Sequence, residues 1–170
     1  MEKWVKSDIL YKGKVVSLRV GEVSLDNGLH TKREVVEHSE GVAIVPILGE
    51  SILFVEQFRI AIGRNIIEIP AGRIEKGETP EEGALRELEE EVGYRAESLI
   101  EKAAYYSSVG YTNEKVHVFI ARDLKKTKSM PEPDEKITIK KIPIKRVREM
   151  LSKSKFEDSK TIIGLREFFC

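Results

Sequence analysis

The sequence lacks the features of an exported, membrane-spanning or disulfide-stabilised protein. Its one cysteine is Cys170, so no internal disulfide can form, and a reducing compartment is expected. No apolar run approaches the roughly 20 residues that a transmembrane helix needs. The first residues also lack an apolar stretch followed by a small-residue cleavage site. We therefore expect a cytoplasmic protein with no membrane partner.

An excess of charge of either sign is also absent. Lys and Arg together number 29, Asp and Glu together number 29, and the net charge is zero. This balance argues against an overall electrostatic attraction to nucleic acid or anionic membranes, so we expect no nucleic-acid partner. The zero conceals an acidic segment, because residues 75–91 contain eight glutamates against Lys76 and Arg86.

The chain shows no internal repeat and no Gly/Ser-rich linker, and 170 residues is the size of one ordinary domain. Residues 15–25 and 31–38 are rich in β-branched side chains, and the Asn27-Gly28 pair between them predicts a hairpin turn. The apolar run at 41–48 predicts a buried central strand. Further strands are expected at 52–58, 103–106, 116–121 and 137–142, a loop at 125–135, and closing helices at 146–151 and 160–169. This order favours an α+β or α/β sandwich.

A central helix is expected to begin after Thr79. Thr79 suits the N-cap, Pro80 the first helical position and Glu82 the third, which together form a capping box. Gly93 is placed to end the helix in a left-handed conformation. The stripe expected to face the core consists of Leu85, Leu88 and Val92.

Glu87, Glu90 and Glu91 share one face of this helix, at spacings i, i+3 and i+4, and are expected to point away from the core. Most glutamate runs are simply solvated surface. Here, however, like charges at i and i+4 repel one another with no lysine between them on that face. Carboxylate oxygens are the ligands that hard divalent cations such as Mg²⁺ prefer. The cluster is therefore a candidate metal site.

The surrounding sequence, GRIEKGETPEEGALRELEEEVGY from Gly72, resembles the Nudix box, in which Gly, Glu, Arg-Glu, Glu-Glu and Gly recur at fixed spacings. One departure is Tyr94, where the family usually has an aliphatic residue. The resemblance implies a Nudix-type α/β/α sandwich with a mixed sheet, preceded by N-terminal antiparallel strands. It divides the chain into residues 1–39, for dimerisation and nucleoside binding, and a hydrolase domain at 40–170.

The same resemblance implies which residues hold the metal. The carbonyl of Ala71 and the carboxylates of Glu87, Glu90 and Glu91 would bind two or more Mg²⁺ ions, with Mn²⁺ as the alternative. Arg86 would hold the carboxylates in place by pairing with Glu90 or Glu82, a supporting role seen around many metal sites. Glu78, just before the helix, has two open interpretations, one in orienting the loop and one in orienting the substrate.

Flanking residues are similar to one subfamily, the ADP-ribose pyrophosphatases. The elements are EQFR at 56–59 and EIPAG at 68–72, with further likeness in the N-terminal strands, in SSVGYTNEKVHVFIA and in DSKTIIGL. The subfamily resemblance implies Mg²⁺-dependent hydrolysis of the pyrophosphate bond of ADP-ribose, giving AMP and ribose 5-phosphate. It also implies a homodimer in which the N-terminal strands pair with the second subunit.

Four further site residues follow from this resemblance. Arg59 would contact the diphosphate, since a guanidinium offers paired donors to phosphate oxygens. Glu68, in the EIPAG element, would also serve substrate binding, and Arg33 and Glu34 would lie near the nucleoside. Glu114 would position or deprotonate the attacking water. From the residues alone, the alternatives are that Arg59 is a sheet-edge arginine paired with Glu56 or Glu68, and that Glu114 is a surface residue.

Two departures keep other substrates open. Many ADP-ribose hydrolases carry proline where this chain has Val109, and the positions of their adenine-stacking aromatics correspond here to Val15 and Arg33. The alternatives are another nucleoside diphosphate sugar, a dinucleotide such as NADH, or a nucleotide-binding regulator without catalysis. An RNA pyrophosphohydrolase would draw on the lysines near Lys140. The histidines, His30, His38 and His117, are expected to be structural or exposed.

Overall fold

The computed structural model describes residues 1–128 and 136–170, so most of the loop expected at 125–135 lies outside the described residues. The strands are β1 (Lys3–Lys12), β2 (Val16–Ser24), β3 (His30–His38), β4 (Gly41–Leu48), β5 (Ser51–Arg59), β6 (Arg64–Glu68), β7 (Ala71–Arg73), β8 (Tyr94–Tyr106), β9 (Lys115–Lys126) and β10 (Thr138–Pro143). The helices are α1 (Pro80–Val92), α2 (Ile144–Ser152) and α3 (Ser159–Phe169). No helix over the described residues is both long and apolar enough to cross a membrane.

The chain divides into two compact units, which are described separately. Unit 1 comprises Met1–Glu40 and Tyr106–Lys115, and unit 2 comprises Gly41–Tyr105 and Val116–Cys170. The loop that carries Glu114 therefore belongs with the N-terminal strands. The assignment of dimerisation and nucleoside binding to residues 1–39 stays a prediction.

Unit 1 contains a three-stranded antiparallel sheet in the order β1-β2-β3. The predicted hairpin joins β2 to β3, with the Leu25 N–H donating to the Leu29 carbonyl at 2.8 Å and Gly28 left-handed at φ 79°. Strand β1 was not predicted, because its charged and polar residues interrupt any apolar alternation. Within this unit, all of which the structure describes, Val23 is the one hydrophobic residue that is buried. The sheet therefore carries almost no core of its own.

Unit 2 is built on a mixed sheet in the order β10-β5-β4-β9-β8, with β6 pairing with β5 and β7 with β4. β4 runs parallel to β9 and antiparallel to β5 and β7. The apolar run of β4 is buried along nearly its whole length, as predicted. Such continuous apolar strands are typical of sheets that are covered on both faces.

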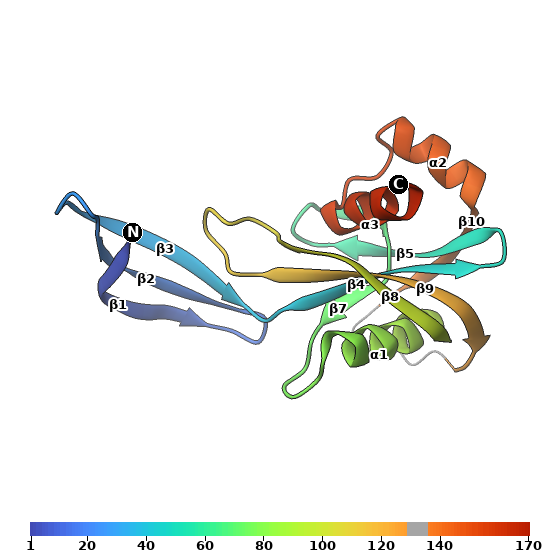
Figure 1. Ribbon diagram of the computed structural model, residues 1–170, viewed down its shortest axis with the longest axis horizontal. Helices are drawn as coiled ribbons and strands as arrows, with labels where there is room; N and C mark the ends of the chain where they lie inside the picture. Colours follow the sequence, from blue (N-terminus) through green and yellow to red (C-terminus); the bar gives the residue numbers. More distant parts are fainter. Residues whose placement is uncertain (129–135) are drawn as a thin grey trace. The chain divides into compact units, whose positions relative to one another are not determined.

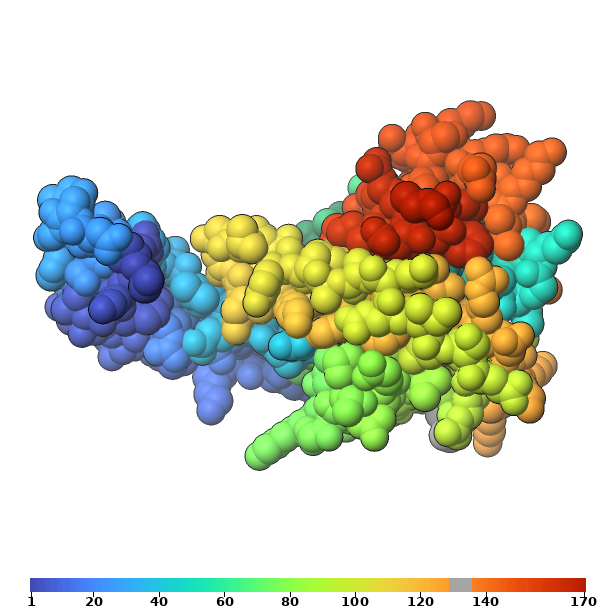
Figure 2. All heavy atoms as spheres, viewed as in Figure 1, coloured from blue at the N-terminus to red at the C-terminus, as the bar shows by residue number. Residues whose placement is uncertain are grey.

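Helices cover both faces of this sheet (Figure 1). Val42 and Ile44 of β4 pack in one cluster with Leu88 and other residues of α1, whereas Ala43 and Val45 pack in a second cluster with residues of α2 and α3. Alternate residues of a strand point to opposite faces, so β4 contributes to both clusters. Figure 2 shows the atoms of α1, in green, apart from those of α2 and α3, in orange and red. The predicted α/β/α sandwich is confirmed.

Two details of the helices bear on the site. The prediction that Leu85 faces the core was wrong, because Ala84 joins Leu88 and Val92 in the cluster and Leu85 does not. These three residues follow the i, i+4 row of the helix. On the other face, α3 approaches the sheet closely at Gly164, where a Cβ atom would lie only 2.9 Å from Ile69 Cδ1.

Candidate active site

The ends of α1 fix the placement of its acidic residues. The Thr79 hydroxyl accepts from the Glu82 N–H at 3.2 Å, and the Glu82 carboxylate accepts from the Thr79 N–H at 2.8 Å. Gly93 ends the helix with φ 70° and ψ 37°, its N–H donating to the Glu89 carbonyl. The predicted capping box and glycine stop are thereby confirmed.

Arg86 lies at the centre of the acidic cluster. Its Nε and Nη2 atoms donate to the two oxygens of Glu78 at 2.8 and 3.0 Å. Its Nη1 donates to Glu87 at 2.8 Å and to Glu90 at 2.9 Å. Nη2 also donates to the carbonyl of Arg73, at 2.9 Å. One guanidinium thus links three carboxylates of the box to the strand that precedes it.

The predicted pairing of Arg86 with Glu90 is confirmed, and the alternative with Glu82 is wrong because Glu82 serves the capping box. The hydrogen bonds from Arg86 lower the pKa of Glu78 from its ordinary value of 4.5, against the opposing effect of burial. The same bonds, led by the one to Glu78, raise the pKa of Arg86 above its ordinary value. Both groups therefore stay charged at neutral pH.

Glu91 is directed inward. It is only 3% exposed, and its carboxylate accepts a hydrogen bond from the Ala71 N–H at 3.0 Å. The prediction that all three glutamates point away from the packing face was therefore wrong for Glu91. The backbone of β7 covers this side of α1, and its N–H group offsets the cost of burying the carboxylate.

Gly72 lies directly against Glu87. A Cβ atom at position 72 would lie 2.0 Å from Glu87 Oε1. Only glycine lets the β7 backbone approach the carboxylate this closely. Ala71, Glu87, Glu90 and Glu91 are thus brought together at one edge of α1.

These groups match the chemistry of a hard divalent cation, which takes carboxylate and carbonyl oxygens. Among the residues that the structure describes, no three His, Cys, Asp or Glu side chains already converge as metal ligands. Instead, Arg86 holds Glu87 and Glu90, and the Ala71 N–H holds Glu91. The donor set fits a divalent metal, because Arg86 engages one oxygen of Glu87 and one of Glu90, and each carboxylate carries a second oxygen.

A second cluster of charged side chains, formed by Arg59 and Glu68, lies at the start of the Glu68–Ala71 segment. Arg59 Nε donates to Glu68 Oε2 at 2.7 Å, and the Glu68 side chain is 3% exposed. Of the two partners expected for Arg59, the structure therefore selects Glu68, whereas Glu56 lies 3.0 Å from Lys140 Nζ. Arg59 is 40% exposed, and neither Nη atom bonds another residue of the described chain. The outer edge of the guanidinium is thus available to an anion.

Sequence reasoning missed three residues that adjoin this group. Lys160 Nζ lies 3.6 Å from Glu68 Oε1 and 2.7 Å from Asp158 Oδ1. Thr161 accepts from the Ile69 N–H at 2.9 Å and donates to Asp158 at 2.8 Å. The sequence signal that could have located these residues is the DSKT run at 158–161. Asp before a helix is a strong N-cap, and the position of the cap fixes which residues form the first turn of the helix.

The remaining predicted residues belong to unit 1. Arg33 donates to both carboxylate oxygens of Glu2, at 2.5 and 2.9 Å, and Glu34 is exposed. The N–H of Glu114 donates to Thr112 Oγ1 at 3.1 Å, and its carboxylate lies 3.8 Å from His38 Nδ1. The roles expected for Arg33, Glu34 and Glu114 stay predictions.

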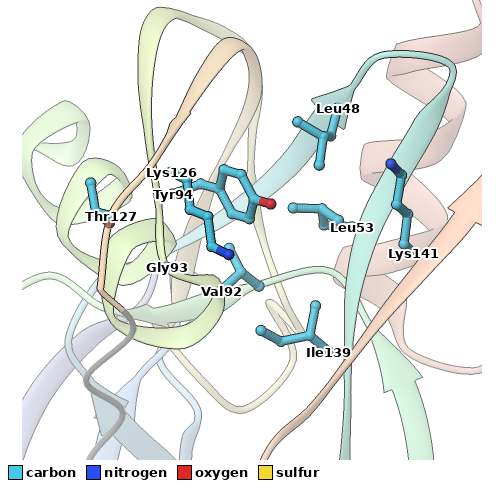
Figure 3. A pocket seen from close by; sticks show the side chains of 9 residues that line it. All are labelled: Leu48, Leu53, Val92, Gly93, Tyr94, Lys126, Thr127, Ile139 and Lys141. Atoms are coloured by element: carbon cyan, nitrogen blue, oxygen red, sulfur yellow. The ribbon is translucent and has the colours of Figure 1, made fainter.

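A pocket of about 370 Å³ lies elsewhere in unit 2, between the C-terminal end of α1 and the ends of β9 and β10 (Figure 3). Its walls are mostly apolar, with the Lys126 side chain beside the ring of Tyr94 and Lys141 on the opposite side. None of the predicted site residues lines it. Tyr94, the departure from the Nudix box, therefore serves this wall and the α1 core cluster.

Comparison with known proteins identifies the class. The NUDIX domain family matches residues 37–163, and the chain belongs to that family. It is 39% identical to the ADP-ribose pyrophosphatase of Bacillus subtilis (strain 168), over 97% of this chain and 91% of the relative. It is 37% identical to the methanol dehydrogenase activator of Bacillus methanolicus, with the same coverage. A crystal structure of an ADP compounds hydrolase superposes with a TM-score of 0.89 at 20% identity, covering 99% of this chain and 92% of the other, which supports the fold.

Proposed function

We propose that this protein hydrolyses the pyrophosphate bond of ADP-ribose to AMP and ribose 5-phosphate. The protein is a pyrophosphohydrolase of the Nudix family, and its near full-length likeness to an ADP-ribose pyrophosphatase supports this substrate. The observation that carries the proposal is the inward carboxylate of Glu91, held by the Ala71 N–H beside Glu87 and Glu90. Burying a carboxylate is costly, so a purely structural helix would have no reason to keep it there.

The carboxylates of Glu87, Glu90 and Glu91 and the carbonyl of Ala71 would hold two or more Mg²⁺ ions, with Mn²⁺ as the alternative. Metal bound there would lower the pKa of a water molecule and offset the charge that builds on the phosphates. Arg86 orients Glu87 and Glu90 through the bonds described above, and Glu78 in turn fixes Arg86. The residues that surround the ligands therefore set the direction in which their oxygens point.

Arg59 would bind the diphosphate of the substrate through its two Nη atoms. Glu68 holds the Nε edge, which leaves the outer edge of the guanidinium for phosphate oxygens. Arg33 and Glu34 would bind the nucleoside. Glu114 would accept the proton of the attacking water, which places it as the general base.

We further propose that the protein acts as a cytoplasmic homodimer through unit 1. Large hydrophobic side chains of this unit are exposed, among them Trp4, Leu10 and Tyr11, and Val23 alone is buried among its described hydrophobic residues. A three-stranded sheet with so little core gains stability from a covering surface. The lone cysteine, Cys170, suits a reducing compartment.

A second candidate belongs to a different class, a nucleotide-binding regulator. It is favoured by one observation, the 37% identity with a methanol dehydrogenase activator. A measurement of turnover distinguishes the hydrolase from the regulator, because a regulator without catalysis binds the nucleotide and leaves it intact.

The proposed function is tested with a substrate panel. Purified protein would be incubated with Mg²⁺ and, separately, ADP-ribose, a nucleoside diphosphate hexose, NADH and 5′-triphosphorylated RNA, and products would be separated by chromatography. We expect AMP and ribose 5-phosphate from ADP-ribose, and loss of turnover when EDTA removes the metal. Preferred cleavage of another member of the panel would contradict the assignment of ADP-ribose.

The metal site is tested with Glu91→Gln. Glutamine can still accept the Ala71 N–H, but it removes the negative charge, so we expect turnover to fall by at least about a hundredfold. Glu89→Gln, a neutral change on the same helix at a position outside the cluster, is the matched control and should retain activity. A Glu91→Gln variant with the wild-type rate in Mg²⁺ would contradict the assignment of Glu91 to the metal site.

A further inference from the structure

We propose that Lys160 is a positioning residue that keeps the outer edge of Arg59 available for the substrate diphosphate, by placing its positive charge beside the second oxygen of Glu68. This inference rests on the proposed function, because it assumes that Arg59 binds the diphosphate. No motif of the Nudix box includes Lys160, which lies in the first turn of α3, far from the box in the sequence.

Glu68 is a buried acid that pairs with two cations. Its carboxylate is 3% exposed, so both oxygens need partners within the protein. Oε2 accepts from Arg59 Nε at 2.7 Å, and Lys160 Nζ lies 3.6 Å from Oε1 and forms an ion pair with it. Within the described residues, these are the two cations that pair with Glu68.

Lys160 itself is held firmly. Its Nζ lies 2.7 Å from Asp158, whose carboxylate caps the N-terminus of α3 by accepting the Thr161 N–H at 2.8 Å. Thr161 is fully buried and accepts the Ile69 N–H, at the residue that follows Glu68. The start of α3 and the Glu68–Ile69 backbone are therefore fastened together, so the lysine cannot drift from Glu68.

The two cations share one buried acid. A guanidinium can form two parallel bonds with a carboxylate, through Nε and one Nη. While the charge of Lys160 lies beside Oε1, Glu68 binds only the Nε atom of Arg59. Without Lys160, Glu68 would draw an Nη atom of Arg59 to Oε1, and the substrate would lose that donor. Lys160 thus affects the substrate through Glu68 and Arg59.

The test compares Lys160→Met with Lys160→Arg and with the wild type. We expect Lys160→Met to raise KM for ADP-ribose about tenfold, the cost of one charge-assisted hydrogen bond, and to leave kcat within about twofold. Lys160→Arg, which keeps the charge, should restore most of the lost affinity. Lys145→Met, at an exposed position of α2, is the matched control and should match the wild type.

A double-mutant cycle separates positioning from direct contact. In an Arg59→Met background, Lys160→Met should raise KM no further, because its effect passes through Arg59. Equal effects in both backgrounds, or an unchanged KM in Lys160→Met, would overturn the proposal. If Lys160→Met does not fold, as judged by circular dichroism, Lys160→Gln replaces it with the same expectations.

The same assays distinguish this proposal from the function on which it rests. A wild-type protein that neither binds ADP-ribose in EDTA, measured by calorimetry, nor hydrolyses it in Mg²⁺ would overturn both. A wild type with normal turnover and an insensitive Lys160→Met variant would overturn only the role of Lys160.

Discussion

Gly72 shows how a single absent methyl group can matter to a reaction. Its α-carbon faces Glu87, and a Cβ atom there would lie 2.0 Å from the carboxylate oxygen. The obstructing atoms are the end of a flexible side chain, so a larger residue would displace the carboxylate more readily than the backbone. The glycine therefore protects the geometry of the site more than the stability of the fold.

We predict that Gly72→Ala lowers kcat at least about tenfold while the free energy of unfolding changes by less than about 1.5 kcal/mol. The physical reason is that the added methyl group in the variant would push the Glu87 carboxylate away from Arg86 and from the β7 backbone. Urea denaturation and initial rates in Mg²⁺ would measure the two effects. A variant that unfolds readily but turns over normally would contradict this account of Gly72.

For individual residues, the spacing in the sequence correctly grouped Glu87, Glu90 and Glu91, because a helix of known period places them on one face. It could not foresee that Glu91 is buried, since periodicity says nothing of what covers a face. Lys160 was missed for a related reason, because its partner Glu68 lies at the end of β6, far from α3 in the sequence.

Among the elements, α3 depends on an ionised cap. Burial, the largest single influence on Asp158, raises its pKa, but Lys160 and the bonds from Thr161 outweigh it and lower the pKa below the ordinary 3.8. A carboxyl whose pKa is lowered by folding contributes stability at pH values above its unfolded pKa. That contribution is lost as the pH falls through the folded pKa.

We therefore predict that Asp158→Asn destabilises the protein by about 1 to 3 kcal/mol at pH 7, and that wild type and variant converge as the pH falls through the lowered folded pKa of Asp158. Asparagine also caps helices well, so the difference reports the charge. Urea denaturation between pH 2 and pH 7 measures it, with Glu167→Gln of the same helix as the control. A difference that stays constant over this range would rule out the ionised cap.

Elements with a strong local signal were predicted almost to the residue. The capping box and Gly93 set the bounds of α1, and the apolar run matched β4 (Gly41–Leu48). β1, β6 and β7 escaped prediction because they are polar or very short, and their pairing depends on neighbours distant in the sequence. β8 was predicted too short, since exposed charged residues alternate along its first half.

For the whole molecule, the exposed side chains of unit 1 determine the predicted assembly. We expect a dimer at micromolar concentration and predict that Leu10→Lys, a change at a residue 67% exposed, shifts it to monomer. Sedimentation velocity would detect the shift. Ile60→Lys, in unit 2 and 86% exposed, should leave the assembly unchanged. A wild type that sediments as a monomer would contradict the assignment of unit 1.

The fold class and the box were predictable because the pattern of the elements and the spacing of Gly72, Glu78, Arg86 and Gly93 are local properties of the chain. The grouping of Tyr106–Lys115 with the N-terminal strands was not predictable. It depends on long-range bonds, such as the Val36 N–H to the Tyr111 carbonyl at 2.7 Å.

Arg86 has a consequence for how the protein matures. Glu87 and Glu90 of α1 and Glu78 just before the helix carry three negative charges close together, and the single positive charge of Arg86, which pairs with all three, opposes their mutual repulsion before any ion arrives. The polypeptide can therefore complete folding in a metal-poor environment and acquire its ions afterwards. This order is the reverse of that in a zinc finger, whose fold depends on the metal. We therefore expect the metal-free enzyme to be folded but inactive, and its activity to rise with the concentration of divalent ions.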